Sequence, residues 1–263
     1  MAPLNTALFR RLRKLTGKAI GDFNLIEEGD RIAVGVSGGK DSYSLLHLLD
    51  TLRRRAPIHY ELVAVNVDAG FPGFRSDIIA AHLEEHGFAH RIEVTDCASI
   101  INEKLRPGSS YCAFCARLRR GVLYTVAQEI GCNKIALGHH LDDFIETLLL
   151  NQFYVGTLGA MSAKLLADNG RQTVIRPLVY IEEKDIAAFC SENTYPVVCC
   201  SCPDEARSDQ KRQKMKQLIA SLAADNKHLK QSMLGALGNV HPRHLLDEEL
   251  KDLYAHRDKE TLR

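Results

Sequence analysis

The sequence has little excess charge of either sign and few aromatic residues. Lys and Arg number 34 and Asp and Glu 33, and aromatic residues make up 6% of the 263 positions. This balance excludes a uniformly basic nucleic-acid coat and a strongly acidic, disordered protein. Because 45% of the residues are hydrophobic, the chain can bury the core of one large domain, or of one domain with a small addition.

The sequence also lacks long apolar runs. No run approaches the roughly 18 residues that span a bilayer, so no membrane association is predicted. The segment 1–18 carries five basic residues but no apolar core of a secretory signal. An organellar transit peptide is the alternative, but the segment continues into Gly21 and the turn at 26–30 without a cleavage-like break. We therefore expect a cytoplasmic protein.

The near-neutral total conceals an uneven distribution of charge. Four short segments hold sixteen Lys and Arg against only Asp22 and Asp209, and they are residues 1–22, 53–55, 117–120 and 207–216. If these segments converge on one face, they form the electrostatic footprint that a phosphate backbone requires. Solvated helix faces are the alternative for each segment taken alone.

From Arg31 onward, short β-branched runs alternate with helical patterns, which is typical of βαβ units. The sequence predicts a doubly wound α/β fold with a parallel sheet and helical additions at both ends. The expected strands are 31–36, 62–68, 90–94, 134–138 and 173–177. The expected helices are 41–54, 76–86, 114–130, 142–153 and 182–191.

Two further helices are expected outside this core. One is amphipathic, with Leu4, Leu8, Leu12 and Leu15 at helical spacing, and the other lies near 208–224. We expect the two to form one basic appendage. The predicted organisation is a basic helix at 1–28, an α/β domain at 29–198 and a C-terminal segment at 199–263.

A glycine-rich loop follows the first expected strand. It reads Ser37, Gly38, Gly39, Lys40, Asp41 and Ser42, and a helix begins within it. Such a turn directs backbone N–H groups and the helix dipole at one spot, which is suited to a phosphate. The spacing fits neither the P-loop of NTPases nor the G-x-G-x-x-G dinucleotide motif.

Polar residues also follow two later strands, at the edge where open α/β sheets bind ligands. Asp68 ends the second strand, and Gly138 and His139 follow the fourth, directly before Asp142 and Asp143. Carboxylates suit Mg²⁺, and we prefer Asp142 for this role. Capping of the following helix is the alternative for either aspartate.

Five of the eight cysteines form two groups. Cys112 and Cys115 have the C-x-x-C spacing of metal ligands, and Cys199, Cys200 and Cys202 follow much later in the chain. A four-ligand zinc site built from Cys112, Cys115, Cys199 and Cys202 is a serious alternative to an iron–sulfur site. The single cysteines 97, 132 and 190 are expected to be buried as small hydrophobes.

The motifs together resemble a known family. S-G-G-x-D-S resembles the loop of the PP-loop ATP pyrophosphatases, and C-x-x-C-x-R-x-R-R-G with G-H-H-x-D-D resembles the tRNA 2-thiocytidine biosynthesis family. The similarity extends over nearly the whole chain, at residues 17–24, 28–30, 62–66, 134–140, 176–178, 183–186 and 239–245.

The resemblance implies ATP-dependent thiolation of cytidine 32 in the tRNA anticodon loop, with AMP and pyrophosphate released. The implied cofactors are ATP, Mg²⁺ and a [4Fe-4S] cluster, and the implied partners are tRNA and a cysteine desulfurase or another sulfur donor. A homodimer is left open. Asp41, Asp142 and Arg119 are the implied catalytic residues. The implied nucleotide-binding residues are Ser37, Gly38, Gly39, Lys40, Asp41, Ser42, Asp68, Gly138 and His139.

Cys112 and Cys115 are two of the three implied cluster ligands. The third is less defined, because the family's P-C-x-x-C-G is replaced here by the sequence from Val198 to Pro203. Cys202 is the choice, with Cys199 or Cys200 as the fallback. The remaining cysteines of the group are candidates for carrying a persulfide.

Two other functions compete with a thiolase. One is a PP-loop adenylating ligase or amidotransferase that acts on RNA and holds zinc in its cysteines. The other is a non-catalytic RNA-binding module, which the intact loop from Ser37 to Ser42 disfavours.

Overall fold

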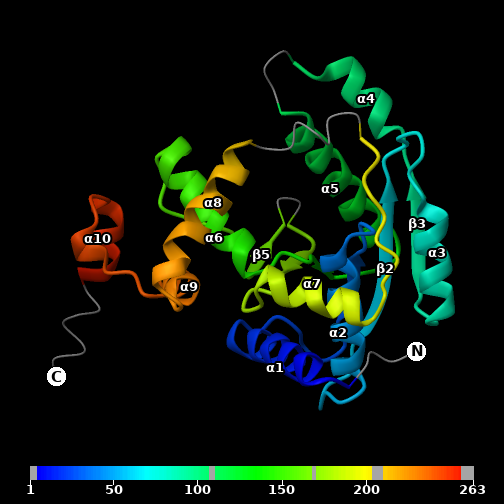
Figure 1. Ribbon diagram of the computed structural model, residues 1–263, viewed down its shortest axis with the longest axis horizontal. Coiled ribbons are helices and arrows are strands. Elements are labelled where there is room, and N and C mark those ends of the chain that lie inside the picture. The colour runs from blue at the N-terminus through cyan, green and yellow to red at the C-terminus, as the bar shows by residue number, and fades with distance from the viewer. Residues whose placement is uncertain (1–4, 107–109, 168–169, 203–209, 256–263) are drawn as a thin grey trace.

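A computed structural model describes residues 5–106, 110–167, 170–202 and 210–255. Its centre is a six-stranded sheet in the order β3-β2-β1-β4-β6-β5 (Figure 1). Neighbouring strands are parallel except β5, which runs antiparallel to β6 at one edge. The strands are β1 (Arg31–Gly35), β2 (Glu61–Asp68), β3 (His90–Val94), β4 (Lys134–Ala136), β5 (Lys164–Leu166) and β6 (Thr173–Ile175).

Helices cover both faces of the sheet, so the predicted doubly wound α/β class is confirmed. The helices are α1 (Ala7–Asp22), α2 (Lys40–Arg53), α3 (Ser76–Glu85), α4 (Cys97–Lys104), α5 (Tyr111–Glu129), α6 (Leu141–Leu150), α7 (Glu183–Glu192), α8 (Gln210–Asp225), α9 (Leu229–Gly238) and α10 (Glu248–Ala255). A π-helical turn, Asn151–Val155, extends α6, and a 3₁₀ turn, Pro242–His244, follows α9.

Alternating side chains of the strands explain the two layers. Val63, Val65 and Val67 of β2 pack with α5 on one face. Ile32 and Val34 of β1 belong to the larger core on the other face, which contains side chains of α2, α3 and α7. Because successive strand residues point to opposite faces, each buried strand supplies two cores.

The terminal helices pack differently from the expectation of one appendage. Helix α1 packs against α2 and α7, with the ring of Phe9 stacked on Phe189 at 5.9 Å. Helix α8 packs against α6 and α9. The apolar faces of α1 and α8 are therefore buried in separate parts of the core. Leu4 and the expected start of the second helix at 208–209 lie outside the described residues, and the division into three segments stays a prediction.

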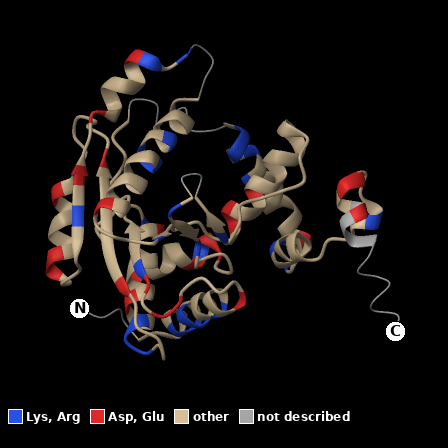
Figure 2. Ribbon diagram, turned by 180° about the vertical axis from the view of Figure 1, so that it is seen from behind, with Lys and Arg blue, Asp and Glu red and all other residues tan. Residues whose placement is uncertain are grey.

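The four basic segments do not converge on one face. Figure 2 shows the Lys and Arg of α5 and α8 near one end of the sheet, whereas those of α1 lie at the other end. Helix α2 starts at the carboxyl end of β1 and ends at Arg53, so residues 53–55 lie towards α1, against which α2 packs. Only the α5 and α8 segments therefore border the carboxyl ends of the strands. Residue 207 and its neighbours 208–209 lie outside the described part of the chain.

None of the helices within the described ranges is both long and apolar enough to cross a bilayer.

The sheet order reverses between β1 and β4. The chain runs outward from β1 to β3, returns to the other side of β1 as β4, and continues to β6. Ligands of open α/β sheets bind at such a switch point, beyond the carboxyl ends of the two strands. Two glycine-containing segments meet here, because a Cβ at Gly138 would lie 3.0 Å from the carbonyl carbon of Asp41 and 3.2 Å from the backbone nitrogen of Ser42.

We predict that Gly138→Ala destabilises the protein by about 1–3 kcal/mol, because the added methyl group must displace rigid backbone at the start of α2. Gly121→Ala is the matched control. A Cβ at Gly121 within α5 would contact nothing within 4 Å, so this variant is expected to gain about 0.5–1 kcal/mol of stability. Urea unfolding followed by circular dichroism measures both changes. If the two variants were equally stable, Gly138 would not lie as close to the backbone of Asp41 and Ser42 as the structure indicates.

Candidate active site

The loop between β1 and α2 is closed by its own hydroxyl groups. The backbone N–H of Ser37 donates to Ser42 Oγ at 3.2 Å, and Ser42 Oγ donates to the carbonyl of Gly39 at 2.8 Å. Gly39 is the N-cap residue of α2 and has no side chain to satisfy the first turn of the helix. The helix dipole and these backbone N–H groups therefore favour an anion at this point.

Gly38 adopts a conformation that favours glycine, with φ of +87°. A Cβ here would lie 2.9 Å from Cδ1 of Ile79 in α3 and 3.2 Å from Cβ of Val198. The Gly38 carbonyl accepts a hydrogen bond from the backbone N–H of Val198 at 2.9 Å. The glycine loop is thereby joined to the segment that contains the last three cysteines.

Charged groups surround the first turn of α2. Lys40 Nζ lies 3.2 Å from Asp41 Oδ2 and 3.1 Å from Glu183 Oε1. Burial opposes the charge of Lys40, but Asp41 and Glu183 outweigh it and raise its pKa. Burial likewise opposes the charge of Glu183, yet hydrogen bonds from Lys216 and Lys40 lower its pKa to about 2. Both partners are therefore charged at neutral pH.

The two carboxylate oxygens of Asp41 differ in their partners. Oδ1 is buried and makes no hydrogen bond to any described residue, and Nε2 of His140 lies 3.7 Å from it. A buried carboxylate oxygen without a partner is costly unless a ligand or cation satisfies it. Asp41 thus meets the geometric requirement for a Mg²⁺ ligand at the loop.

The two aspartates after β4 have defined partners. Asp142 Oδ2 accepts from the backbone N–H of Glu183 at 2.7 Å, and its Oδ1 lies 2.6 Å from Lys230 Nζ. Asp143 Oδ2 accepts from the backbone N–H of His140 at 3.0 Å, at the start of α6. Asp143 therefore has the capping role that the sequence analysis left open. Asp142 thus ties α6 to α7 and α9, and each of its carboxylate oxygens has a partner.

Asp68 stabilises the turn after β2. Its Oδ1 accepts from the backbone N–H of Gly70 at 2.9 Å, and its Oδ2 accepts from Ser76 Oγ at 2.8 Å. These bonds orient the turn and the start of α3 beside the glycine loop. Asp68 is 8% exposed, so its geometry suits positioning of the loop more directly than contact with a ligand.

His139 lies among guanidinium groups at the carboxyl end of β4. Arg176 Nε donates to His139 Nδ1 at 3.1 Å, and the buried Arg176 also donates to the Ser162 carbonyl at 2.6 Å. Burial, followed by repulsion from Arg176, lowers the pKa of His139 to about 4. Arg120 and Arg212 also lie within electrostatic range of His139. A neutral imidazole among three cations is suited to an anionic ligand.

The cysteine groups meet at the amino end of α5. The structure starts this helix at Tyr111, earlier than expected, so Cys112 and Cys115 both lie in its first turns. Cys115 and Cys202 pack against the same apolar cluster, which contains Phe71 and Ile101. The sulfurs of Cys200 and Cys202 are 3.5 Å apart. Segments far apart in the sequence thus bring four thiols to one place.

Burial raises the pKa of the Cys115 thiol, and the guanidinium of Arg119 opposes this effect. Cys97, Cys112 and Cys200 also lie close enough to interact electrostatically with Cys115. Cys97 is buried, as are Cys132 and Cys190, which confirms the prediction for all three. Cys199 is exposed.

The two adjacent arginines of α5 serve different parts of the site. Arg119 interacts with Cys115, whereas Arg120 interacts with His139 and Arg176. Helix α5 therefore spans the space between the thiols and the carboxyl end of β4. This arrangement brings Arg119 to the cysteine group and Arg120 to the end of the sheet.

Sequence reasoning missed three residues at this site: Arg176, Glu183 and Lys230. Arg176 and Glu183 lie within the short segments that resemble the thiocytidine family, and this resemblance could have identified them. Lys230 lies in α9, a helix that the periodicity did not predict, and nothing in the sequence pairs it with Asp142.

Comparison with known proteins gives consistent results. Residues 4–201 match the PP-loop domain family. The tRNA-cytidine(32) 2-sulfurtransferase of Syntrophotalea carbinolica is 74% identical over 93% of this chain and 95% of its own length. That of Geobacter metallireducens is 64% identical over 92% of this chain and 95% of its length.

Among solved structures, the chain resembles the U34-tRNA thiolase NcsA from Methanococcus maripaludis with its [4Fe-4S] cluster. The TM-score is 0.71, with 22% identity, 89% of this chain covered and 80% of the other. At this identity the likeness concerns the fold alone, and it agrees with the sheet described above.

Proposed function

The chain belongs to the tRNA-cytidine(32) 2-sulfurtransferase family of PP-loop proteins, and we propose that it uses ATP to replace the C2 oxygen of cytidine 32 in tRNA with sulfur. The observation that carries the proposal is the 2.9 Å hydrogen bond from Val198 to Gly38. It joins an anion-binding loop to a segment of three cysteines. An adenylating group and a sulfur-handling group are needed at one site for this reaction.

The first step activates the base. The C2 oxygen of cytosine is a poor leaving group, so it attacks the α-phosphate of ATP, and the bond to the β-phosphate breaks with release of pyrophosphate. The loop from Ser37 to Ser42 and the dipole of α2 stabilise the charge on the pyrophosphate. Asp41 would hold a Mg²⁺ ion, which would neutralise part of this charge. Support for this role is the buried Asp41 Oδ1, which lacks a partner among the described residues.

The ion pair of Lys40 and Glu183 holds the positive charge of Lys40 beside the position proposed for the reacting phosphates. The pair keeps an ammonium group at the start of α2, and Glu183 is itself fixed by Lys216 at 2.9 Å. Asp142 accepts from the Glu183 backbone, so it positions this pair rather than acting on the phosphate itself. His139, Gly138 and Asp68 shape the rest of the pocket.

The cysteines fit a [4Fe-4S] cluster. Thiolates are the ligands that such clusters use, and Cys115 and Cys202 pack against a common apolar cluster. Cys112, Cys115 and one cysteine of the pair 200 and 202 would hold the group. When bound, a cluster with three cysteine ligands would supply an iron that can bind sulfur. In the second step, sulfur at the oxidation level of sulfide bonds to C2 of the base, and the bond between C2 and the adenylated oxygen breaks, so that this oxygen leaves with AMP.

The third ligand is argued from contacts with Cys115. Cys202 packs against the same apolar cluster as Cys115, which supports Cys202 as the third ligand. The Cys200 sulfur, 3.5 Å from that of Cys202, is then the candidate for carrying a persulfide. Arg119 lowers the cost of a thiolate at Cys115.

The tRNA is proposed to approach over α5 and α8. The basic residues of these helices border the carboxyl ends of the strands (Figure 2), and phosphate contacts by Lys and Arg provide sequence-independent affinity. The target base must be unstacked to enter the pocket. Sulfur would come from a cysteine desulfurase or another donor in the reducing cytoplasm, where free thiols persist. A homodimer stays a prediction.

We predict that the anaerobically purified protein is brown, with broad visible absorption, and that Cys112→Ala and Cys115→Ala abolish the colour. Cys202→Ala is expected to abolish it and Cys200→Ala to retain it. Cys132→Ala, at a buried cysteine outside this group, is the matched control and keeps the colour. Absorption spectra and iron analysis provide the readout. Colourless protein with one zinc per chain at these cysteines would exclude the cluster.

We also predict that the protein releases AMP from ATP only with a tRNA that has cytidine at position 32. Asp41→Asn should lower this rate about 10²–10³-fold, because the variant loses a carboxylate ligand of the Mg²⁺ that would stabilise the charge on the leaving pyrophosphate. Asp77→Asn, at an exposed pair with Arg75, is the control and should leave the rate unchanged. An unchanged rate with Asp41→Asn would remove the loop from the mechanism.

A further inference from the structure

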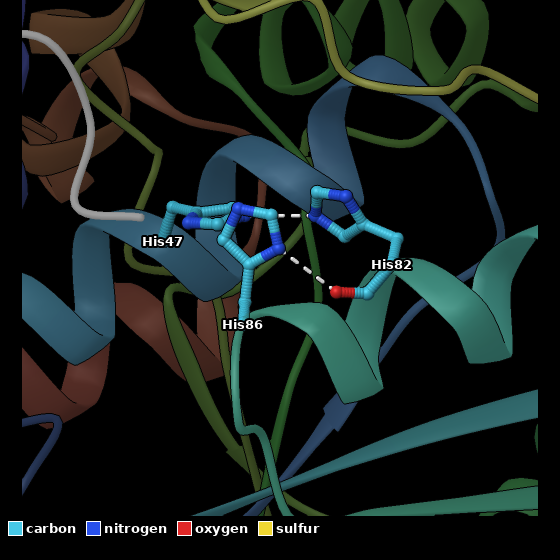
Figure 3. Close-up of side chains that lie close together, drawn as sticks. All are labelled: His47, His82 and His86. Atoms are coloured by element: carbon cyan, nitrogen blue, oxygen red, sulfur yellow. Dashed lines mark hydrogen bonds between the residues drawn. The ribbon is translucent and has the colours of Figure 1, made fainter.

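Three imidazoles gather behind the glycine loop, outside the site described above. His47 lies on α2, His82 on α3, and His86 is the residue that ends α3. One ring nitrogen from each lies within 4.8 Å of the other two. Figure 3 shows the three rings facing one another across the contact between the two helices.

Two of the rings share a proton. Nε2 of His47 lies 3.0 Å from Nε2 of His82, and such a contact requires one nitrogen to carry a proton and the other to accept it. Each ring can instead place its proton on Nδ1 and offer a lone pair at Nε2. A metal ion bound between these nitrogens would replace the shared proton.

His86 is already in the tautomer that a metal ligand needs. Its Nδ1 lies 2.9 Å from the backbone carbonyl of His82, so Nδ1 must carry the proton and donate it. In the neutral form of this ring, the lone pair is on Nε2. A backbone carbonyl on the far nitrogen is the usual way in which proteins orient a metal-binding imidazole. His82 and His86 also have the i, i+4 spacing that places two ligands on one face of a helix.

The surroundings fix the rings and keep them neutral. The ring of Tyr195 stacks on His47 at 4.5 Å, and the ring of Tyr43 meets His82 edge-on at 4.8 Å. Burial, together with repulsion between the rings, lowers the pKa of His47 to about 3 and that of His82 to about 4. The lone pairs are therefore available at neutral pH. His86 is only half-buried, which leaves a route for an ion and a water molecule.

We propose that His47, His82 and His86 form a binding site for one Zn²⁺ ion, with water as the fourth ligand. Neutral imidazole is a preferred ligand of zinc, and three imidazoles with water complete a tetrahedral site. The ion joins α2 to α3. Because Ile79 of α3 lies against the backbone of Gly38, the ion fixes the helix that supports the glycine loop. The site is separate from the cysteines.

The test uses the full chain carrying Cys112→Ser and Cys115→Ser, so that zinc cannot occupy the cysteine pair. Equilibrium dialysis against Zn²⁺ should give one bound ion per chain. His86→Gln should weaken this binding at least about 10-fold, in line with the loss of a group on which a metal site depends. His90→Gln is the matched control, because His90 lies on β3 outside the cluster, and its zinc affinity should equal that of the parent.

X-ray absorption at the zinc edge identifies the ligands independently of any histidine variant. The proposal requires nitrogen and oxygen neighbours at about 2.0 Å, with the pattern of imidazole rings, and no sulfur shell at about 2.3 Å. A sulfur shell, absence of bound zinc, or equal affinities of His86→Gln and His90→Gln would each overturn the proposal.

Discussion

The site depends on one backbone hydrogen bond, from the N–H of Val198 to the carbonyl of Gly38. It brings the chain just before Cys199 to the loop that follows the first strand. The left-handed φ of Gly38 makes this carbonyl available, and the absence of a Cβ lets Ile79 and Val198 lie against the loop. This hydrogen bond and the packing of Val198 against the core set the position of the last cysteines relative to the nucleotide loop.

The second constraint is the close approach of two backbones at the switch point of the sheet. Gly138 lies against the start of α2, so the residues after β4 share a pocket with the glycine loop. Cations gather at the same edge. Lys40, Arg176 and Arg212 each pair with an acid or an imidazole, which holds them in place. Many of the charges at this edge are therefore locally paired.

Much of this architecture was predictable from residue patterns, because β-branched runs alternate with amphipathic helices from Arg31 onward. β3 was predicted with its observed bounds, and the glycine loop was recognised from its own residues. The antiparallel β5 was missed, because its three residues, Lys164–Leu166, are too few to show a period. The early start of α5 was also missed, although it moves Cys112 into the helix.

The contacts that complete the site could not be read from the sequence, because they join segments far apart in the chain. Asp142 meets Lys230 from α9, and Glu183 meets Lys40 from α2. The sequence shows each basic segment but not its place in the fold, so it could not show that α1 lies far from α5. His47 lies on α2, and His82 and His86 lie at the end of α3, with β2 between the two helices in the sequence. Only the packing of α2 on α3 brings the three histidines together.

The central claim is that this chain inserts sulfur at C2 of cytidine 32. The most direct measurement is mass spectrometry of tRNA nucleosides from cells that lack the gene and from the same cells supplied with it. The account predicts that 2-thiocytidine is absent without the gene and returns with it. Unchanged 2-thiocytidine in the deletion strain would contradict the account.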